Sequence, residues 1–281
     1  MSFFGKPKKS KKTVKKKAKK ATKPVKKVKK VMLRKPVIGA KKVKSKKSKV
    51  KKMSIKKSVK RTVKKAKVIK PDFKKMPDEK AYLILKRYKI NLPKYEFCKN
   101  EKQLAMALKK VGFPCVMKVS GDIIHKTDVN GVRKNVSSEE EAVKVFGELM
   151  KIKGCETVLV QESIEEGYEL IVGGKKDSQF GRVIALGAGG IFTDFLKDVS
   201  FRIVPLGRED AEDMLNEVKF SDLILKGFRD KKPANQKAIV DSIISVSKIM
   251  EKYPNIKEID INPLFATPTK TIAADVRIIL E

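Results

Sequence analysis

The sequence predicts an α+β body of two lobes that follows a disordered, lysine-rich tail. Charge divides the chain, because residues 1–70 hold 33 of the 68 Lys and Arg residues and no Asp or Glu. The rest of the chain is nearly neutral, and in it short β-prone runs alternate with amphipathic segments, as in mixed domains. We expect a tail over 1–75, a first lobe with a leading helix over 76–158, and a second lobe over 159–281.

The tail is of low complexity and rich in lysine. Its few apolar residues and its self-repulsion favour disorder. Its lysines would attract a polyanion through counterion release, so non-specific nucleic-acid binding through residues 1–70 is one interpretation and a merely solubilising extension is the other. The only aromatic residues in this stretch are Phe3 and Phe4. Base stacking is therefore not expected.

Composition excludes several other classes of protein. No run approaches the roughly 18 apolar residues of a membrane span, and no signal-peptide core lies near the start. The cysteines Cys98, Cys115 and Cys155 are odd in number and widely spaced, which fits neither a disulfide framework nor a zinc site. We expect reduced thiols and a cytoplasmic location.

The first lobe is predicted from one β-prone run and two capping patterns. Cys115, Val116, Met117 and Val119 form a short apolar run, and the polar residues 120–122 end it. Asn100 with Gln103, and Ser137 with Glu140, have the spacing of a capping box. The expected order is helix 78–88 with Asp78 as its cap, strand 95–98, a helix to Val111 ended by Gly112, strand 115–119, strand 131–136, and a helix to about 152 with Val143, Phe146, Leu149 and Met150 facing inward.

The second lobe is predicted to begin with an apolar strand. Residues 157–161 form that strand, and we expect 168–172 and 182–186 as its antiparallel neighbours. Two helices follow at 208–218 and 233–253, the second with Pro233 near its first turn. The last expected elements are strands 258–262 and 271–275.

His125 is the only histidine in the chain. It follows strand 115–119 in a polar loop, where a side chain is able to reach a ligand. A lone histidine is more often an ordinary surface or core residue than a catalytic one. Lys118, at the end of the same strand, would place a point charge on a phosphate group. The alternative for Lys118 is a solvated lysine.

Two later patterns suit anions and metals. Residues 187–190 (Gly-Ala-Gly-Gly) allow close approach of backbone N–H groups to a phosphate, although such a loop is usually only a turn. Asp260 and Asn262 lie two apart and therefore share a face of their strand, with Asp275 beside them on the next. Such oxygen ligands suit Mg²⁺. The alternative is a polar strand end with a turn at Asn262 and Pro263.

Several segments together resemble the ATP-grasp domain of the beta subunit of ADP-forming acetyl-CoA synthetase, a relative of the succinyl-CoA synthetase beta subunit. The resemblance covers about residues 80–281 and implies the two-lobed ATP-grasp fold. It rests on Val116-Met-Lys118, Ile124-His-Lys-Thr-Asp128 with Gly131-Val132, Gln179-Phe-Gly181, Leu186-Gly-Ala-Gly-Gly-Ile-Phe192, Leu196-Lys-Asp-Val-Ser-Phe-Arg202 and Ile259-Asp-Ile-Asn-Pro-Leu-Phe265.

The resemblance also implies roles for individual residues in binding Mg²⁺ and ATP or ADP. The metal would be held by Asn262 and Asp275, with Asp260 facing a phosphorylated histidine or the metal. The nucleotide residues implied are Lys118 and the loop glycines Gly189 and Gly190 at the phosphates, Gln161 and Glu162 at the adenine, Glu169 at the ribose, and Lys126 and Arg202 neutralising the moving charge. Gln161 and Glu162 could equally cap the end of a strand.

His125 matches the family histidine that relays a phosphoryl group to ADP. In that family a histidine of the CoA-binding alpha subunit first receives the phosphoryl group from an acyl phosphate. This chain has neither a CoA-binding half nor a second histidine, so a partner alpha subunit is implied. The predicted function is the nucleotide-binding beta subunit of an ADP-forming acyl-CoA (acetyl-CoA) synthetase. The alternatives are a polyanion-binding protein with a vestigial body and an ATP-grasp ligase for another acid and amine pair.

Overall fold

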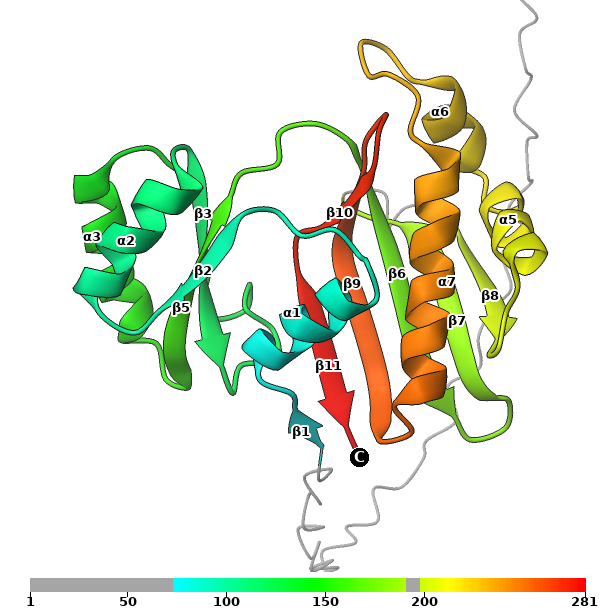
Figure 1. The fold of residues 1–281 in the computed structure, drawn as a ribbon, viewed down its shortest axis with the longest axis horizontal. Helices are drawn as coiled ribbons and strands as arrows, with labels where there is room; N and C mark the ends of the chain where they lie inside the picture. Colours follow the sequence, from blue (N-terminus) through cyan, green and yellow to red (C-terminus); the bar gives the residue numbers. More distant parts are fainter. Residues whose placement is uncertain (1–72, 191–197) are drawn as a thin grey trace, which may run out of the picture. The chain divides into compact units, whose positions relative to one another are not determined.

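The computed structural model describes residues 73–190 and 198–281, which form two antiparallel sheets with helices (Figure 1). The tail was predicted over 1–75, and of this range residues 1–72 lie outside the described residues. The same is true of Ile191, Phe192, Leu196 and Lys197 in two of the segments that carry the resemblance. The predicted end of the tail was wrong, because Lys74 and Lys75 form strand β1, which pairs with strand β11 (Val276–Leu280) of the body. The α+β class of the body is confirmed. In the described residues, no helix is both long and apolar enough to cross a membrane.

The smaller sheet has four strands in the order β2-β5-β3-β4, and all of its pairs are antiparallel. Helices α2 and α3 pack on it around a core that includes Leu104, Met117 and Leu149. Its elements are β2 (Tyr95–Cys98), α2 (Glu101–Val111), β3 (Cys115–Gly121), β4 (Val132–Val136), α3 (Glu139–Met150) and β5 (Cys155–Glu162).

The caps of these helices follow the sequence with small shifts. The Asn100 side chain accepts a hydrogen bond from the Gln103 N–H, and Gly112, with φ of 82°, ends α2 as expected. The cap of α3 is Ser138, which accepts from Glu141, so the prediction of Ser137 was one residue early. Val143 was predicted to face inward, but 41% of it is exposed, because Ala142 and Val145 occupy the buried face.

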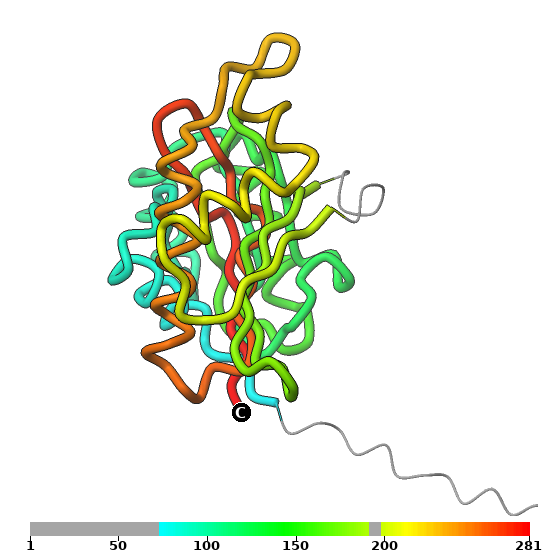
Figure 2. The backbone as a smooth tube through the Cα atoms, turned by 90° about the vertical axis from the view of Figure 1, so that its right-hand side faces the viewer, coloured from blue at the N-terminus to red at the C-terminus, as the bar shows by residue number. Residues whose placement is uncertain are grey.

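The larger sheet has seven strands in the order β1-β11-β9-β6-β7-β8, with β10 paired to β9. Helices α1 and α7 lie on the same face of this sheet, as Figures 1 and 2 show together. Its elements are β1 (Lys74–Lys75), α1 (Asp78–Arg87), β6 (Tyr168–Asp177), β7 (Gly181–Ala188), β8 (Val199–Ile203), α5 (Arg208–Glu217), α6 (Ser221–Lys226), α7 (Gln236–Lys252), β9 (Ile256–Ala266), β10 (Thr271–Ala273) and β11 (Val276–Leu280).

Strand β5 was assigned to the wrong sheet. It was expected beside β6 in the second lobe, but it pairs with β2 and β3, so the expected boundary at 158/159 falls inside this strand. Strand β7 was also expected beside β5, but it pairs with β6 and β8. Because β5 is a central strand, Val158, Leu159 and Val160 are all buried, and such a continuous apolar run does not indicate which sheet a strand joins.

Three further details differ from the expected elements. Helix α7 begins after Asn235, whose side chain caps it, and not near Pro233. The expected strand 271–275 ends at Ala273 as β10, and strand β11, which begins after Asp275, was not predicted. Pro263 lies within β9 rather than in a turn, and helix α6 was not predicted.

Candidate active site

A cavity of about 520 Å³ lies where residues of the two sheets meet. Strands β3, β4 and β5 and the loop that carries His125 contribute one wall, and strands β6, β9 and β11 with the preceding Asp275 contribute the other. Most of the candidate residues meet here. Those that line the cavity are Lys118, His125, Lys126, Gln161, Glu162, Glu169, Asp260, Asn262 and Asp275.

Lys118 is a buried cation at the floor of the cavity. Its Nζ donates to the Ala274 carbonyl oxygen at 2.7 Å and to Gln161 Oε1 at 3.3 Å, so it bridges the two sheets. Burial lowers the pKa of this lysine to about 8, although the charge of Asp275 opposes the shift. Lys118 is therefore poised to lose its proton in the mildly alkaline range.

This pKa predicts a pH-dependent affinity for phosphate ligands. Below pH 8 Lys118 is a cation and attracts phosphate, whereas above pH 8 it becomes neutral. We expect Mg-ADP affinity, measured by calorimetry, to fall from pH 8 to 9.5 by up to about tenfold per pH unit. Lys118→Met should bind more weakly at pH 7 and should not show this fall. An equally steep fall in the variant would assign it to another group.

Lys126 connects two carboxylates beside Lys118. Its Nζ lies 2.7 Å from Asp275 Oδ1 and 3.6 Å from Asp78 Oδ2, and its side chain is only 7% exposed. Burial alone would lower the pKa of Lys126, but Asp275 and Asp78 outweigh that effect and raise it. Burial would likewise raise the pKa of Asp275, and Lys126 and Lys118 overcome that effect and lower it. Lys126 and Asp275 are therefore both charged at neutral pH.

His125 lies exposed at the rim of the cavity. Its Nδ1 is 3.4 Å from Nη1 of Arg277. The Nη2 atom of the same guanidinium group pairs with Glu258 at 2.7 Å and with Asp260 at 3.5 Å. The loop is closed by a hydrogen bond from the Gly131 N–H to the Lys126 carbonyl oxygen. The only histidine thus lies beside a guanidinium group and lines the same cavity as two buried lysines, where a transferred anionic group would be stabilised.

Asp260, Asn262 and Asp275 all line the cavity at the β9 and β11 end. The Asn262 N–H donates to the Asp275 carbonyl oxygen at 3.3 Å. Burial raises the pKa of Asp260, although Arg277 opposes it. No group of three or more Asp, Glu, His or Cys side chains able to hold a metal occurs in the parts of the chain described. One carboxylate and one amide fit Mg²⁺, which keeps waters and phosphate oxygens as its other ligands.

Three candidate residues do not line the cavity. Gly189 and Gly190 pack against Glu169, so closely that a Cβ atom at Gly190 would lie 2.6 Å from Glu169 Oε2. The φ of 63° at Gly190 also favours glycine. Arg202 lies elsewhere on the larger sheet, where its guanidinium group pairs with Glu217 of α5.

Two residues of the site were missed from the sequence. Arg277 lies opposite Asp260 in the β9 and β11 register, so the strand pairing would have identified it. Asp78 was predicted as a helix cap, but Pro77 occupies that position and the Asp78 carboxylate pairs with Lys75 and Lys126. No local sequence pattern indicated that Asp78 pairs with Lys126, because Lys126 lies in the His125 loop, far from Asp78 in the sequence.

Comparisons with known proteins place this chain in one family. The family model described as an ATP-grasp domain matches residues 67–280, and the chain belongs to this family. A relative, "Acetate--CoA ligase [ADP-forming] II" of Archaeoglobus fulgidus, is 44% identical over 70% of this chain, which spans only 29% of that relative. A second, "Acetate--CoA ligase [ADP-forming] I subunit beta" of Pyrococcus furiosus, is 40% identical over 75% of this chain and 94% of the relative.

Solved structures give the same result. The dinucleotide-forming acetyl-coenzyme A synthetase 1 of Ca. Korarchaeum cryptofilum, in complex with coenzyme A, Ca-AMPCP and HgCl+, has a TM-score of 0.69 and 36% identity, covering 74% of this chain and 94% of that one. Another structure of that enzyme (TM-score 0.64, 37% identity, covering 74% and 93%) contains coenzyme A and Mg-AMPPCP, with a phosphohistidine segment pointing towards the nucleotide binding site. The expected resemblance and the ATP-grasp fold are confirmed.

Proposed function

We propose that this chain is the nucleotide-binding beta subunit of an ADP-forming acyl-CoA synthetase of the acetate–CoA ligase class. The observation that carries the proposal is the position of His125, which lies beside Arg277 and lines the same cavity as Lys118 and Lys126. The P. furiosus relative, matched over 94% of its length, is itself a beta subunit. The thiols of Cys98, Cys115 and Cys155 are free, as in a cytoplasmic protein.

In this proposal the cavity of about 520 Å³ binds ADP or ATP. Lys118 and Lys126 contact the phosphates, and Gln161 and Glu162, at the end of β5 where the chain leaves the smaller sheet, contact the adenine. Glu169, with Gly189 and Gly190 packed against it, lies at the ribose and phosphate side. Asn262 and Asp275 would hold Mg²⁺, which neutralises phosphate oxygens when bound. Arg202, paired with Glu217, has no part in this mechanism.

His125 carries the phosphoryl group between two acceptors. An imidazole nitrogen of His125 attacks the phosphorus of a phosphorylated histidine on the CoA-binding alpha subunit, forming one N–P bond as the other breaks. An oxygen of the ADP β-phosphate then attacks the same phosphorus, the His125 N–P bond breaks, and ATP forms. Arg277 stabilises the charge near His125, and Asp260 orients Arg277. The acyl group never enters this cavity.

Label transfer from γ-labelled ATP tests the proposal. The purified chain with Mg²⁺ should acquire acid-labile, base-stable label in the reverse direction, and EDTA should abolish it.

Asp275→Asn should reduce the Mg-ATP affinity by about tenfold or more, since it removes a charged ligand. Exposed Asp222→Asn on α6 is the matched control. Absence of label on a chain that binds Mg-ATP would contradict the relay. Turnover of an acid and an amine without a partner subunit would instead favour another ATP-grasp ligase.

A further inference from the structure

A groove of about 640 Å³ is lined by residues of helices α1 and α7 on the larger sheet. The two helices lie over the same face of this sheet in Figure 1, and the rings of Tyr88 and Tyr253, which follow them, are 6.2 Å apart. Thr271 of β10 and Arg208 of α5 complete the lining. No described residue lines both this groove and the cavity that contains His125. The groove is therefore a separate candidate site.

The charged residues that line this groove are almost all of one sign. Side chains at helical spacing along α7 face it, together with residues at the end of α1 and beside β10. These charged residues are the basic Arg87, Lys89, Arg208, Lys237, Lys248 and Lys270 and the acidic Asp241. The body as a whole is nearly neutral, so positive charge is concentrated here. Such a concave lining attracts anions.

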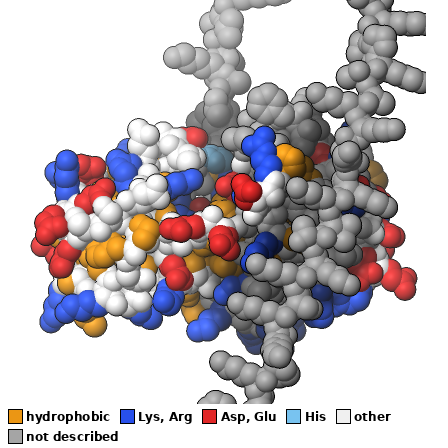
Figure 3. Space-filling model, turned by 90° about the horizontal axis from the view of Figure 1, so that it is seen from above, with side chains coloured by type: hydrophobic (Ala, Val, Ile, Leu, Met, Phe, Trp, Pro, Cys, Tyr) orange, Lys and Arg blue, Asp and Glu red, His pale blue; other side chains and the backbone are white. Residues whose placement is uncertain are grey.

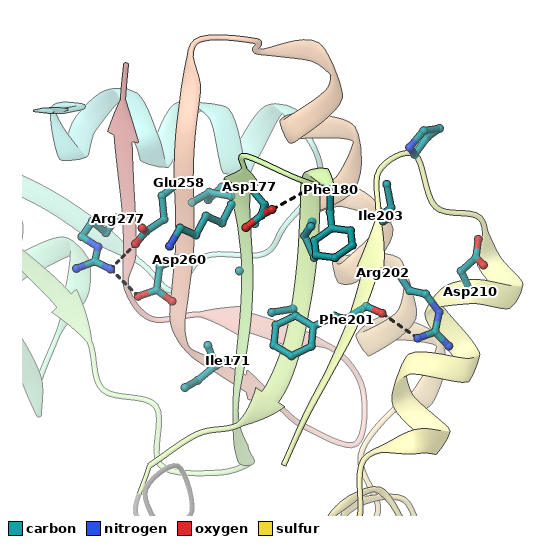
Figure 4. Close-up of a pocket in the computed structure, with 17 residues that line it drawn as sticks. Ile171, Asp177, Phe180, Phe201, Arg202, Ile203, Asp210, Glu258, Asp260 and Arg277 are labelled. Carbon is teal, nitrogen blue, oxygen red and sulfur yellow. Dashed lines mark hydrogen bonds and ion pairs between the residues drawn. The ribbon is translucent and has the colours of Figure 1, made fainter. Parts of the chain in front are cut away.

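Another groove of the same sheet, of about 1,060 Å³, carries both signs of charge (Figure 4). Its charged residues are Asp177, Asp210, Glu258 and Asp260 with Lys175, Arg202 and Arg277. In that groove Arg277 pairs with Glu258 and Asp260, so opposite charges neutralise one another. The 640 Å³ groove, unlike this one, selects a ligand by its charge.

Most cations of the 640 Å³ groove have no counter-ion among the described residues. Asp241 holds two of them, since its Oδ1 lies 2.6 Å from Arg208 Nη2 and its Oδ2 lies 2.7 Å from Lys237 Nζ. The other four are exposed, and their side chains form no hydrogen bond or ion pair with a described residue: Arg87, Lys89, Lys248 and Lys270. Like charges gathered in this way repel one another, and a bound anion relieves that repulsion.

The rest of the lining indicates the kind of anion. Only Ala238, Ile244 and the Tyr88 ring are apolar, whereas a bound peptide or protein needs several apolar anchors. One aromatic ring is also too few for the base stacking that holds single-stranded nucleic acid. The volume is that of a small-molecule pocket. Arginine and lysine together suit phosphate oxygens.

We propose that this groove is a second anion site, which binds a small ligand carrying a chain of phosphate groups, either free or as part of a nucleotide. Lys89 and Lys248 contact the phosphates from the two helices, and Lys270 contacts them from the residue before β10. The tail is excluded as the occupant, because residues 1–70 contain no Asp or Glu. The inference goes beyond the proposed function and does not depend on it, since the two sites share no lining residue.

Lysine footprinting of the full-length chain tests the proposal. An amine-reactive reagent, read residue by residue by mass spectrometry, separates the groove lysines from those of the tail. Inorganic tripolyphosphate, without Mg²⁺ and in about tenfold excess over its dissociation constant, should slow the labelling of Lys89, Lys248 and Lys270 about tenfold. Lys144 of α3 and Lys151 after it are exposed on the smaller sheet's side and should change by no more than about twofold.

Two double variants separate the groove from net charge. Lys248→Glu with Lys270→Glu reverses two charges of the groove, and Lys144→Glu with Lys151→Glu makes the same change of charge elsewhere. In the groove variant, protection of Lys89 should require at least about tenfold more tripolyphosphate. The control variant should protect Lys89 as the wild type does. Equal losses in both variants would reduce the effect to general electrostatics and overturn the proposal.

The choice of anion distinguishes the remaining outcomes. Protection of Lys89 by ATP as well as by tripolyphosphate would assign the phosphate chain to a nucleotide, and protection by tripolyphosphate alone would assign it to a free oligophosphate. Both results support the site. Protection by a single-stranded oligonucleotide but not by tripolyphosphate would make the groove a nucleic-acid interface instead. Protection confined to lysines of residues 1–70 would show that the chain binds phosphate only through its tail.

Discussion

His125→Ala is expected to reduce phosphoryl transfer between the chain and ATP by at least about 10⁴-fold, the scale seen when a covalent nucleophile is removed. No other histidine in the sequence is available to replace it. Because the His125 side chain is exposed and the nucleotide phosphates are assigned to Lys118 and Lys126, Mg-ADP affinity should change by no more than about threefold. Acid-labile label and calorimetric affinity, measured on the same preparation, check the two parts separately.

The control for this prediction is Asp128→Ala. Asp128 lies in the same loop and is exposed, but it does not line the cavity. It should keep both label and affinity near the wild-type values. If His125→Ala lost Mg-ADP binding together with label, the histidine would be a structural part of the loop. If it kept the label, the phosphorylated residue would be another side chain.

Much of the fold was predictable because strand and helix periods are local properties. The capping of α2 by Asn100 and its end at Gly112 were predicted from residues a few positions apart. The placement of β5 was wrong, since pairing between strands depends on residues distant in the sequence. The described body also differs from residues 1–70 in charge, and acidic and basic side chains are interspersed over the face shown in Figure 3.

The site shows the same division between local and distant information. Asp260 and Asn262 were predicted to share a face from their spacing alone, and both line the same cavity. Arg202 followed from the resemblance rather than from geometry, and the structure places it with Glu217, outside the cavity. Arg277 and Asp78 were missed because their partners come from other strands and loops. A residue whose role depends on a distant partner is not identifiable from its own neighbourhood.

Asp78→Asn is expected to lower the free energy of unfolding more than any other single substitution at this site. The Asp78 side chain is 1% exposed and lies 2.9 Å from Lys75 Nζ and 3.6 Å from Lys126 Nζ. Asparagine fills the same space but leaves two buried ammonium groups without their shared anion. Breaking a buried ion pair in this way costs about 3–5 kcal/mol. Urea unfolding, with the m-value as a check on two-state behaviour, measures the loss.

Glu79→Gln is the matched control, because Glu79 lies in the same first turn of α1 but is exposed. It should cost no more than about 0.5 kcal/mol. Replacing the Lys75 and Asp78 pair together by Met and Leu should recover part of the loss, since apolar side chains need no counter-ion and Lys126 keeps Asp275. If Asp78→Asn alone lowered the free energy of unfolding no more than Glu79→Gln does, water would have to reach Lys75 and Lys126. The expected large loss would show that Asp78 ties β1 and α1 to the loop that carries His125.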